Sequence, residues 1–183
     1  GTLTATTSYT FSNTSGTSSA SAVLAGASVT FTKSGAGTTL LSGLNTFSGK
    51  TSVSGGMLEF SSIANVSGGA SSFGAPITTA NGTIDIGSGT GSFTLRYVGS
   101  GNTTNRVINM AGTTGGVTLD ASGSGPLVFS STFTATGAGN KTFTLTGSST
   151  ANNSIVSVPN STGTTSVDKT GSGLWRLTGA SSF

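Results

Sequence analysis

The sequence predicts an all-β protein, and within that class a parallel β-helix (β-solenoid) with almost no helix. Three observations lead to this fold class. Short segments alternate apolar with small polar residues, glycine-rich turns separate these segments, and no window places apolar residues at the i, i+3, i+4, i+7 spacing of an amphipathic helix. A β-sandwich array is the alternative that such a pattern also allows.

The alternating segments are the expected strands. The clearest are Thr83–Gly87, Ser92–Gly99, Val117–Ala121, Leu127–Phe133 and Lys141–Gly147. Their Thr, Val, Ile and Phe residues favour a pleated surface with one buried face. Between them lie turns such as GSGTG and TGAGN, in which glycine can adopt the positive φ angles that tight turns need.

The spacing of the strands favours stacked coils over a sandwich. One expected inward residue from each strand recurs every 10 to 14 positions, in the series Ile84, Leu95, Val107, Leu119, Phe129, Phe143 and Ile155. Inward positions hold Val, Ile, Leu and Phe, which suits ladders of like residues between coils. A sandwich protects its edge strands with charges and proline, yet only 6% of residues are charged and three are proline.

A near-copy of one segment marks a longer repeat. The stretch Thr32–Gly49 matches Val167–Phe183, with equivalent pairs Lys33 and Lys169, Gly35 and Gly171, Gly37 and Gly173, Leu41 and Leu177, Gly43 and Gly179, and Phe47 and Phe183. Residues 1–47 recur as roughly residues 133–183. We therefore interpret residues 1–183 as one continuous solenoid segment, in which a tandem unit of about 136 residues is present in about one and a third copies. The segment is either a piece of a longer chain or the protomer of a stacking filament.

Both ends of this segment lack an evident polar cap. The sequence opens within the strand-like GTLTAT and closes at Phe183 within the motif. Because the terminal coils of a solenoid expose unpaired backbone and apolar side chains, we expect the partners to be adjoining repeats of the same chain or neighbouring copies stacked end to end.

The motif carries a family resemblance. Lys33–Phe60 resembles the autotransporter-associated β-strand repeat at the positions Gly35, Gly37, Leu41, Ser42, Gly43, Asn45, Phe47, Ser48, Gly49, Thr51, Val53, Gly56 and Leu58. The later copy matches at Gly171, Gly173, Leu177, Thr178, Gly179 and Phe183, but has Ser181 where the pattern expects Asn. The resemblance implies a bacterial protein that is extracellular or attached to the cell surface through a β-helical stalk, and it implies no enzymatic activity.

Composition narrows the possible functions. The seven cations are scattered singly, whereas a nucleic-acid interface needs a clustered basic face, so we expect no nucleic-acid partner. The chain has no Cys and no His, which removes the commonest ligands of zinc and haem. No run approaches the length of a membrane helix, so we expect no membrane-spanning segment. We expect no cofactor and no metal.

Candidate catalytic and carbohydrate-binding residues are few. Asp85 and Asp120 are the carboxylates of the strand-rich centre that could share a surface one or two coils apart, with Arg96 and Arg106 between them in the sequence. We interpret these charges as aids to solubility and coil register, because β-helical glycosidases need converging carboxylates. Trp175 and Arg176 could stack on a sugar, but we favour packing for Trp175.

These observations leave three hypotheses. The first is a non-catalytic structural repeat of an extracellular bacterial fibre, stalk or giant surface protein. The second is an adhesin or glycan-binding passenger segment, and the third is a carbohydrate-active β-helix enzyme. The residues predicted to matter are the structural positions of the motif: Gly35, Gly37, Leu41, Gly43, Phe47, Gly171, Gly173, Leu177, Gly179 and Phe183.

Overall fold

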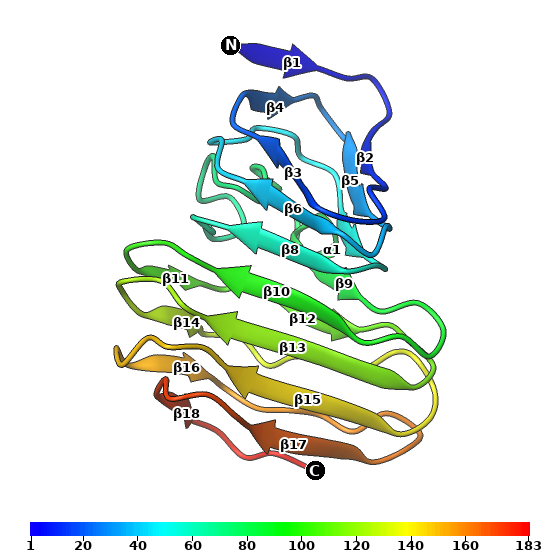
Figure 1. The fold of residues 1–183 in the computed structure, drawn as a ribbon, viewed down its shortest axis with the longest axis vertical. Coiled ribbons are helices and arrows are strands. Elements are labelled where there is room, and N and C mark those ends of the chain that lie inside the picture. The colour runs from blue at the N-terminus through cyan, green and yellow to red at the C-terminus, as the bar shows by residue number, and fades with distance from the viewer.

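The computed structural model describes residues 1–183 as a stack of coils built from parallel strands (Figure 1). Every pairing between named strands is parallel, in sheets of seven, five, four and two strands. The seven-stranded sheet takes one strand from each of seven coils, in the order β17-β15-β13-β10-β8-β6-β3. The predicted parallel β-helix is therefore confirmed, and the β-sandwich alternative is wrong.

The strands are short because each forms only one side of a coil. They are β1 (Thr2–Thr4), β2 (Ser8–Phe11), β3 (Thr17–Ala20), β4 (Val23–Ala25), β5 (Thr30–Lys33), β6 (Thr38–Leu41), β7 (Thr51–Val53), β8 (Met57–Phe60), β9 (Ile84–Ile86), β10 (Phe93–Tyr97), β11 (Asn102–Thr104), β12 (Ile108–Met110), β13 (Gly115–Ala121), β14 (Leu127–Phe129), β15 (Lys141–Thr146), β16 (Asn153–Ile155), β17 (Thr165–Lys169) and β18 (Trp175–Leu177). The single helical turn is α1 (Thr79–Gly82).

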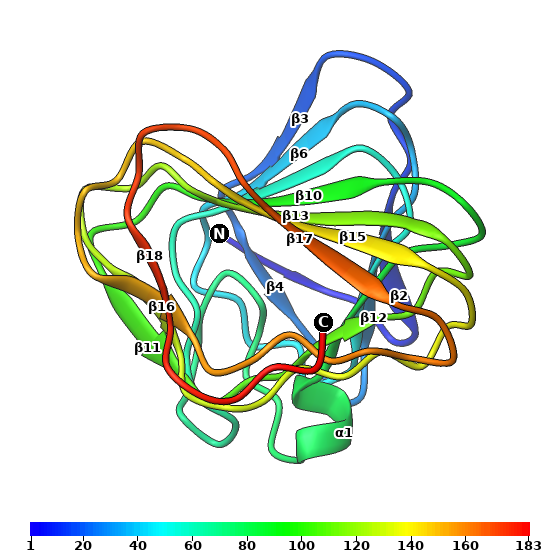
Figure 2. The ribbon, with the colours of Figure 1, turned by 90° about the horizontal axis from the view of Figure 1, so that it is seen from below.

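The chain visits three sides in turn, as the view along the stack shows (Figure 2). One side is the five-stranded sheet β12-β9-β7-β5-β2, and the next is the seven-stranded sheet. The third side consists of β1 and β4 near the N-terminus and the sheet β11-β14-β16-β18 near the C-terminus. Irregular segments complete this side between the two sheets.

The strand register gives the length of a coil directly. Thr38 pairs with Met57 near the N-terminal end of the stack, and Gly115 pairs with Lys141 nearer the C-terminal end. The coils near the C-terminal end are therefore longer than those near the N-terminal end. The exception lies between β8 and β10, where Met57 pairs with Thr94 and the intervening residues 61–83 form an insertion that includes α1. In Figure 2, α1 lies outside the outline of the coils.

Inward side chains of successive coils stack on like side chains. Leu58, Leu95, Leu119 and Leu145 follow one another in register through β8, β10, β13 and β15, and each is at most 2% exposed. Full burial of one such side chain is worth about 1.5 to 3 kcal/mol. Ladders of this kind join the 29 buried apolar residues into one continuous core along the stack.

The prediction is wrong for one member of the inward series. Val107 is only half-buried, whereas Arg106 and Ile108 on either side of it are fully buried. The physical reason is that the inward positions of this segment are Thr104, Arg106 and Ile108, so Val107 lies on the outward phase of an unbroken alternation. The other six members of the series are buried as predicted.

Candidate functional site: the repeat motif and its uncovered copy

The first copy of the motif forms a corner between two sides of the solenoid. Lys33 ends β5 in the five-stranded sheet, residues 34–37 form the turn, and β6 continues in the seven-stranded sheet. Gly43 and Phe47 follow on the third side, where Thr46 and Phe47 donate backbone hydrogen bonds to the Leu24 carbonyl. One motif therefore spans a complete circuit of the sides.

The motif glycines let neighbouring coils approach closely. A Cβ atom on Gly35 would collide with the backbone carbonyls of Ser12 and Asn13 in the coil before it. On Gly43 a Cβ atom would lie 2.5 Å from the Ala22 carbonyl oxygen, which is closer than real Cβ contacts allow. Glycine is required here by backbone proximity, because neither residue has a positive φ.

The motif lysine, Lys33, occupies an inward position that holds hydrophobic residues in the neighbouring coils. In the register of the five-stranded sheet Lys33 lies between Phe11 and Val53, and it is fully buried. Its ammonium donates to the Gly35 carbonyl of its own turn and, over 3.3 Å, to the Gly55 carbonyl of the next coil. Burial lowers the pKa of this ammonium group below its usual value of 10.5. Lys33 thus joins two turns of consecutive coils without a carboxylate partner.

The motif asparagine also joins consecutive coils. The Asn45 side chain is fully buried; its Oδ1 accepts a hydrogen bond from the Leu24 N–H at 2.8 Å, and its Nδ2 donates to the Ser72 carbonyl at 2.7 Å. Asn153 does the same farther along the stack, accepting from Leu127 N–H and donating to the Leu174 carbonyl. In the later motif copy Ser181 accepts from Val158 N–H over 3.2 Å, so the shorter side chain keeps half of the bridge.

The second copy lies at the C-terminal end of the stack, where no coil covers it. Leu177 and Phe183 are 39% and 57% exposed, whereas their equivalents Leu41 and Phe47 are fully buried. Lys169 is exposed and folds over its own turn, donating to the Thr170 and Gly171 carbonyls at 2.6 and 3.0 Å. Both copies therefore run strand, turn, strand, but Gly171 has a φ of 64° where Gly35 has no positive φ, and only the first copy has neighbours on both sides.

The two copies occupy different corners of the solenoid. The first passes from the five-stranded to the seven-stranded sheet through β5 and β6, and the second passes from the seven-stranded to the four-stranded sheet through β17 and β18. In the seven-stranded sheet β17 lies five coils after β6. The interval between the two copies thus corresponds to five coils and one additional side.

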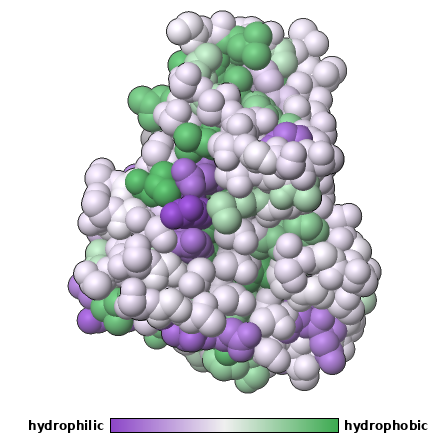
Figure 3. Space-filling view, in the orientation of Figure 1, coloured by the Kyte–Doolittle hydropathy of each residue, from purple (hydrophilic) through white to green (hydrophobic).

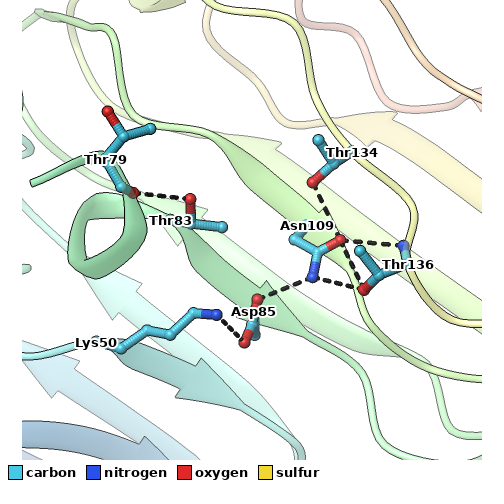
Figure 4. Close-up of polar contacts among 7 residues, drawn as sticks. All are labelled: Lys50, Thr79, Thr83, Asp85, Asn109, Thr134 and Thr136. Carbon is cyan, nitrogen blue, oxygen red and sulfur yellow. Dashed lines mark hydrogen bonds and ion pairs between the residues drawn. The ribbon is translucent and has the colours of Figure 1, made fainter.

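The charged residues lie on separate faces and pair locally. On β9 in the five-stranded sheet, Asp85 receives the Lys50 ammonium at 2.6 Å and an Asn109 amide hydrogen bond at 2.9 Å (Figure 4). Asn109 in turn contacts Thr134 and Thr136 of the next coil, so one polar ladder crosses four coils.

The second charged group belongs to the seven-stranded sheet. Arg96 on β10 lies between Glu59 on β8 and Asp120 on β13, at 3.5 and 3.6 Å. Asp85 and Asp120 therefore do not converge on one surface, which was the arrangement that a carboxylate pair for glycan cleavage required. The structure shows no cluster of three or more acidic, His or Cys residues that could hold a metal ion.

The sequence did not indicate the role of Arg106. Its guanidinium group is fully buried, donates to the Gly82 carbonyl and the Phe73 carbonyl, both over 2.8 Å, and lies over the Phe73 ring. Burial lowers the pKa of Arg106 to about 9. Both carbonyls belong to the insertion, so Arg106 attaches residues 61–83 to the coil that follows.

Trp175 packs as predicted. It is 9% exposed and its indole N–H donates to the Thr146 carbonyl at 2.7 Å, while Arg176 projects to solvent from the opposite face of the strand. The two side chains therefore form no joint sugar-stacking surface. None of the helical structure is long and apolar enough to cross a membrane.

Comparison with known families identifies the motif. The passenger-associated-transport-repeat model matches residues 31–60 and residues 167–183, which are the two copies described above. Neither a curated protein nor a solved structure matches the chain. With the β-solenoid fold, this match confirms the resemblance to autotransporter passenger repeats. That the interval between the two copies repeats in tandem stays a prediction.

Proposed function

We propose that this chain, which carries passenger-associated transport repeats, is a rigid, non-catalytic segment of an extracellular bacterial fibre, stalk or large surface protein. The observation that carries the proposal is the unbroken parallel pairing of seven coils in one sheet. At the spacing of paired strands, such a stack extends about 30 Å along its axis. Its motif residues serve coil stacking rather than the binding of a substrate.

The interactions that join the coils suit a rigid spacer outside the cell. Backbone ladders and inward apolar residues connect each coil to the next, and Lys33, Asn45 and Asn153 add buried side-chain bridges. None of these bridges depends on a disulfide, since the chain has no cysteine. The face in Figure 3 is mostly of neutral hydropathy, as expected for Ser- and Thr-rich strands, with separate hydrophobic and hydrophilic patches.

Localisation and shape can be tested together. Antibodies against the folded chain should label intact cells of the producing bacterium, and immunogold electron microscopy should place the label on thin threads or stalks at the cell surface. Pre-immune serum is the control. Labelling confined to the cytoplasm, or native material consisting of uniform globules, would contradict the proposal.

Glycan binding is the second candidate, and one observation favours it. The outward hydroxyls of Thr94, Thr118 and Thr144 lie in register on three adjacent strands of the seven-stranded sheet, and they make no hydrogen bond within the protein. A polymer rich in hydroxyl groups could bind along such a column.

A glycan array tests this second function. Binding should fall in the triple variant Thr94→Val, Thr118→Val and Thr144→Val, which keeps the shape of the strands but removes the hydroxyls. The matched control is Thr10→Val on the five-stranded sheet. Binding no stronger than background, or equal for both variants, would exclude the column as a glycan site.

A further inference from the structure

We propose that Asn81 is a site of spontaneous deamidation, and that the closed conformation of α1, held by Arg106, sets the rate of this modification. Asn81 and Gly82 form the only Asn-Gly pair in the sequence, and they lie in α1 within the insertion of residues 61–83. In Figure 2, α1 projects from the outline of the coils. The inference concerns the insertion and does not depend on the proposed role of the solenoid.

The reaction uses only the chain and water. The backbone nitrogen of Gly82 attacks Cγ of the Asn81 side chain, a C–N bond forms, and the side-chain nitrogen leaves as ammonia with the proton of the Gly82 N–H. Water then opens the cyclic imide at either carbonyl, which gives aspartate or isoaspartate at position 81. Glycine favours the attack because it has no Cβ to obstruct its nitrogen and leaves the backbone free to rotate.

The glycine of this pair is required by packing. Gly82 is buried, and a Cβ atom on it would lie 2.4 Å from Cγ2 of Val66. The valine side chain is branched at Cβ and cannot rotate freely to make room. Its backbone is also held, because the Val66 N–H donates to the Asn105 side chain at 2.8 Å. The insertion therefore needs glycine after Asn81, and the reactive pair follows from this requirement.

The folded conformation of α1 opposes the reaction. The Gly82 N–H donates to the Thr78 carbonyl at 2.8 Å, so its nitrogen is not free to attack. The Thr83 N–H donates to the Thr79 carbonyl at 2.9 Å, and the Thr83 hydroxyl donates to the same carbonyl (Figure 4). Attack requires the Gly82 bond to break and the backbone of Asn81 to leave its helical conformation. The rate of deamidation therefore follows the fraction of molecules in which α1 is open.

Contacts from outside the helix hold α1 closed. Helices shorter than about 12 to 15 residues are marginal in water by themselves, and α1 has four residues. Its support from the following coil is Arg106, which is fully buried and donates through Nε to the Gly82 carbonyl at 2.8 Å. At its start, the Thr78 hydroxyl accepts from the Asn81 N–H at 3.3 Å. Loss of either contact should open α1 more often and speed the reaction.

Deamidation should also release the insertion. Isoaspartate adds a carbon to the backbone, so the bond from the Thr83 N–H to the Thr79 carbonyl, which spans position 81, loses its geometry. The Gly82 carbonyl then moves away from Arg106, whose guanidinium keeps the Phe73 carbonyl as its acceptor. Because a buried charge with missing partners is costly, the insertion should detach from the coil that follows.

The test incubates the folded chain at mildly alkaline pH and follows its peptides by mass spectrometry, with aspartate and isoaspartate products separated by retention time. Asn152, which is exposed and precedes another asparagine, is the internal reference. In the natural chain Asn81 should react before Asn152. Thr78→Val should raise the rate at Asn81 about fivefold, as expected for the loss of a helix cap. Arg106→Lys, which keeps the charge but not the planar donor group, should raise it about tenfold or more.

Hydrogen exchange gives the second measurement. Exchange over residues 61–83 should be faster after deamidation, while residues 141–146 of β15 stay unchanged. The control is Asn81→Gln, which should keep slow exchange through the same incubation. Reaction at Asn81 no faster than at Asn152 would overturn the site. Equal rates at Asn81 in the natural chain, in Thr78→Val and in the urea-unfolded chain would overturn the role of α1, even if Arg106→Lys failed to fold.

Discussion

The two copies of the repeat motif share a sequence but not an environment. Leu41 and Phe47 of the first copy are fully buried, whereas Leu177 and Phe183 of the second are substantially exposed. The strands and turns of the two copies have the same order. The difference shows that the motif encodes the local corner, while burial of its apolar residues comes from the next coil.

This division of roles follows from the way a solenoid is stabilised. Each coil contacts only its neighbours, so stability is approximately a sum of coil and interface contributions. A substitution in the first copy disturbs two interfaces, and the equivalent substitution in the second copy disturbs one. Matched pairs of variants therefore measure what a covering coil contributes.

The phenylalanine pair should give the largest difference. Phe47 stacks on Phe31 with ring centroids 5.9 Å apart and also contacts Tyr9. Phe47→Ala should lower the free energy of unfolding by about 3 to 5 kcal/mol, measured by urea denaturation. Phe183→Ala is the control and should change it by less than about 0.5 kcal/mol. A comparable loss in both variants would contradict the account.

The leucine pair should follow in size. Leu41 lies in the seven-stranded sheet between Ala20 and Phe60 and is fully buried. Leu41→Ala should cost about 2 to 5 kcal/mol in the same assay. Leu177→Ala should cost clearly less, because part of its side chain already contacts water. Equal costs would mean that the coil over Leu41 adds no packing energy.

The lysine pair tests the buried bridge. Lys33→Met keeps the length of the side chain but leaves the Gly35 and Gly55 carbonyls without their donor. The expected loss is about 1 to 3 kcal/mol, the penalty for unsatisfied buried polar groups. Lys169→Met removes an exposed ammonium and should be nearly neutral, within about 0.5 kcal/mol. A stabilised Lys33→Met variant would show that the buried charge costs more than its hydrogen bonds return.

The pH dependence of the lysine pair should give the smallest effect. Since burial lowers the pKa of Lys33 below 10.5, the unfolded chain binds more protons than the folded chain between the two pKa values. The contribution of Lys33 to the free energy of unfolding is therefore lower at pH values below its pKa in the folded chain. It rises as the pH approaches 10.5. The free energy of unfolding of the natural chain, relative to that of Lys33→Met, should therefore increase as the pH is raised. Urea denaturation at a series of alkaline pH values measures this difference. A difference that shrinks with pH would contradict the lowered pKa.

Much of the fold could be predicted from the sequence. Alternation indicated the strands, and ladders of like residues such as Leu58 and Leu95 fit the preference for stacked coils. The match of Gly35 with Gly171 and of Leu41 with Leu177 also came from the sequence, although Gly171 has a φ of 64° and Gly35 has no positive φ. These features are local or repeat at regular intervals, and a single sequence shows them.

Other features depend on contacts between coils and could not be predicted. Lys33 and Arg106 look like outward residues until carbonyls of neighbouring coils are placed around them. The insertion of residues 61–83 shows no periodic alternation of apolar residues. Nothing in the sequence therefore indicated that Arg106 attaches it to the next coil. Alternation also does not reveal which side of the coil a strand forms, which is why the change of corner between the motif copies appeared only in the structure.

Thiol labelling tests the central claim most directly, because the natural chain has no cysteine and gives no background. Leu41→Cys and Leu177→Cys place a thiol at equivalent positions of the two copies, and their reaction rates with a thiol reagent are compared under native conditions. If the covering coil determines burial, Leu177→Cys should react about a hundredfold faster or more, since labelling of Leu41→Cys requires local unfolding. Equal rates would contradict the account.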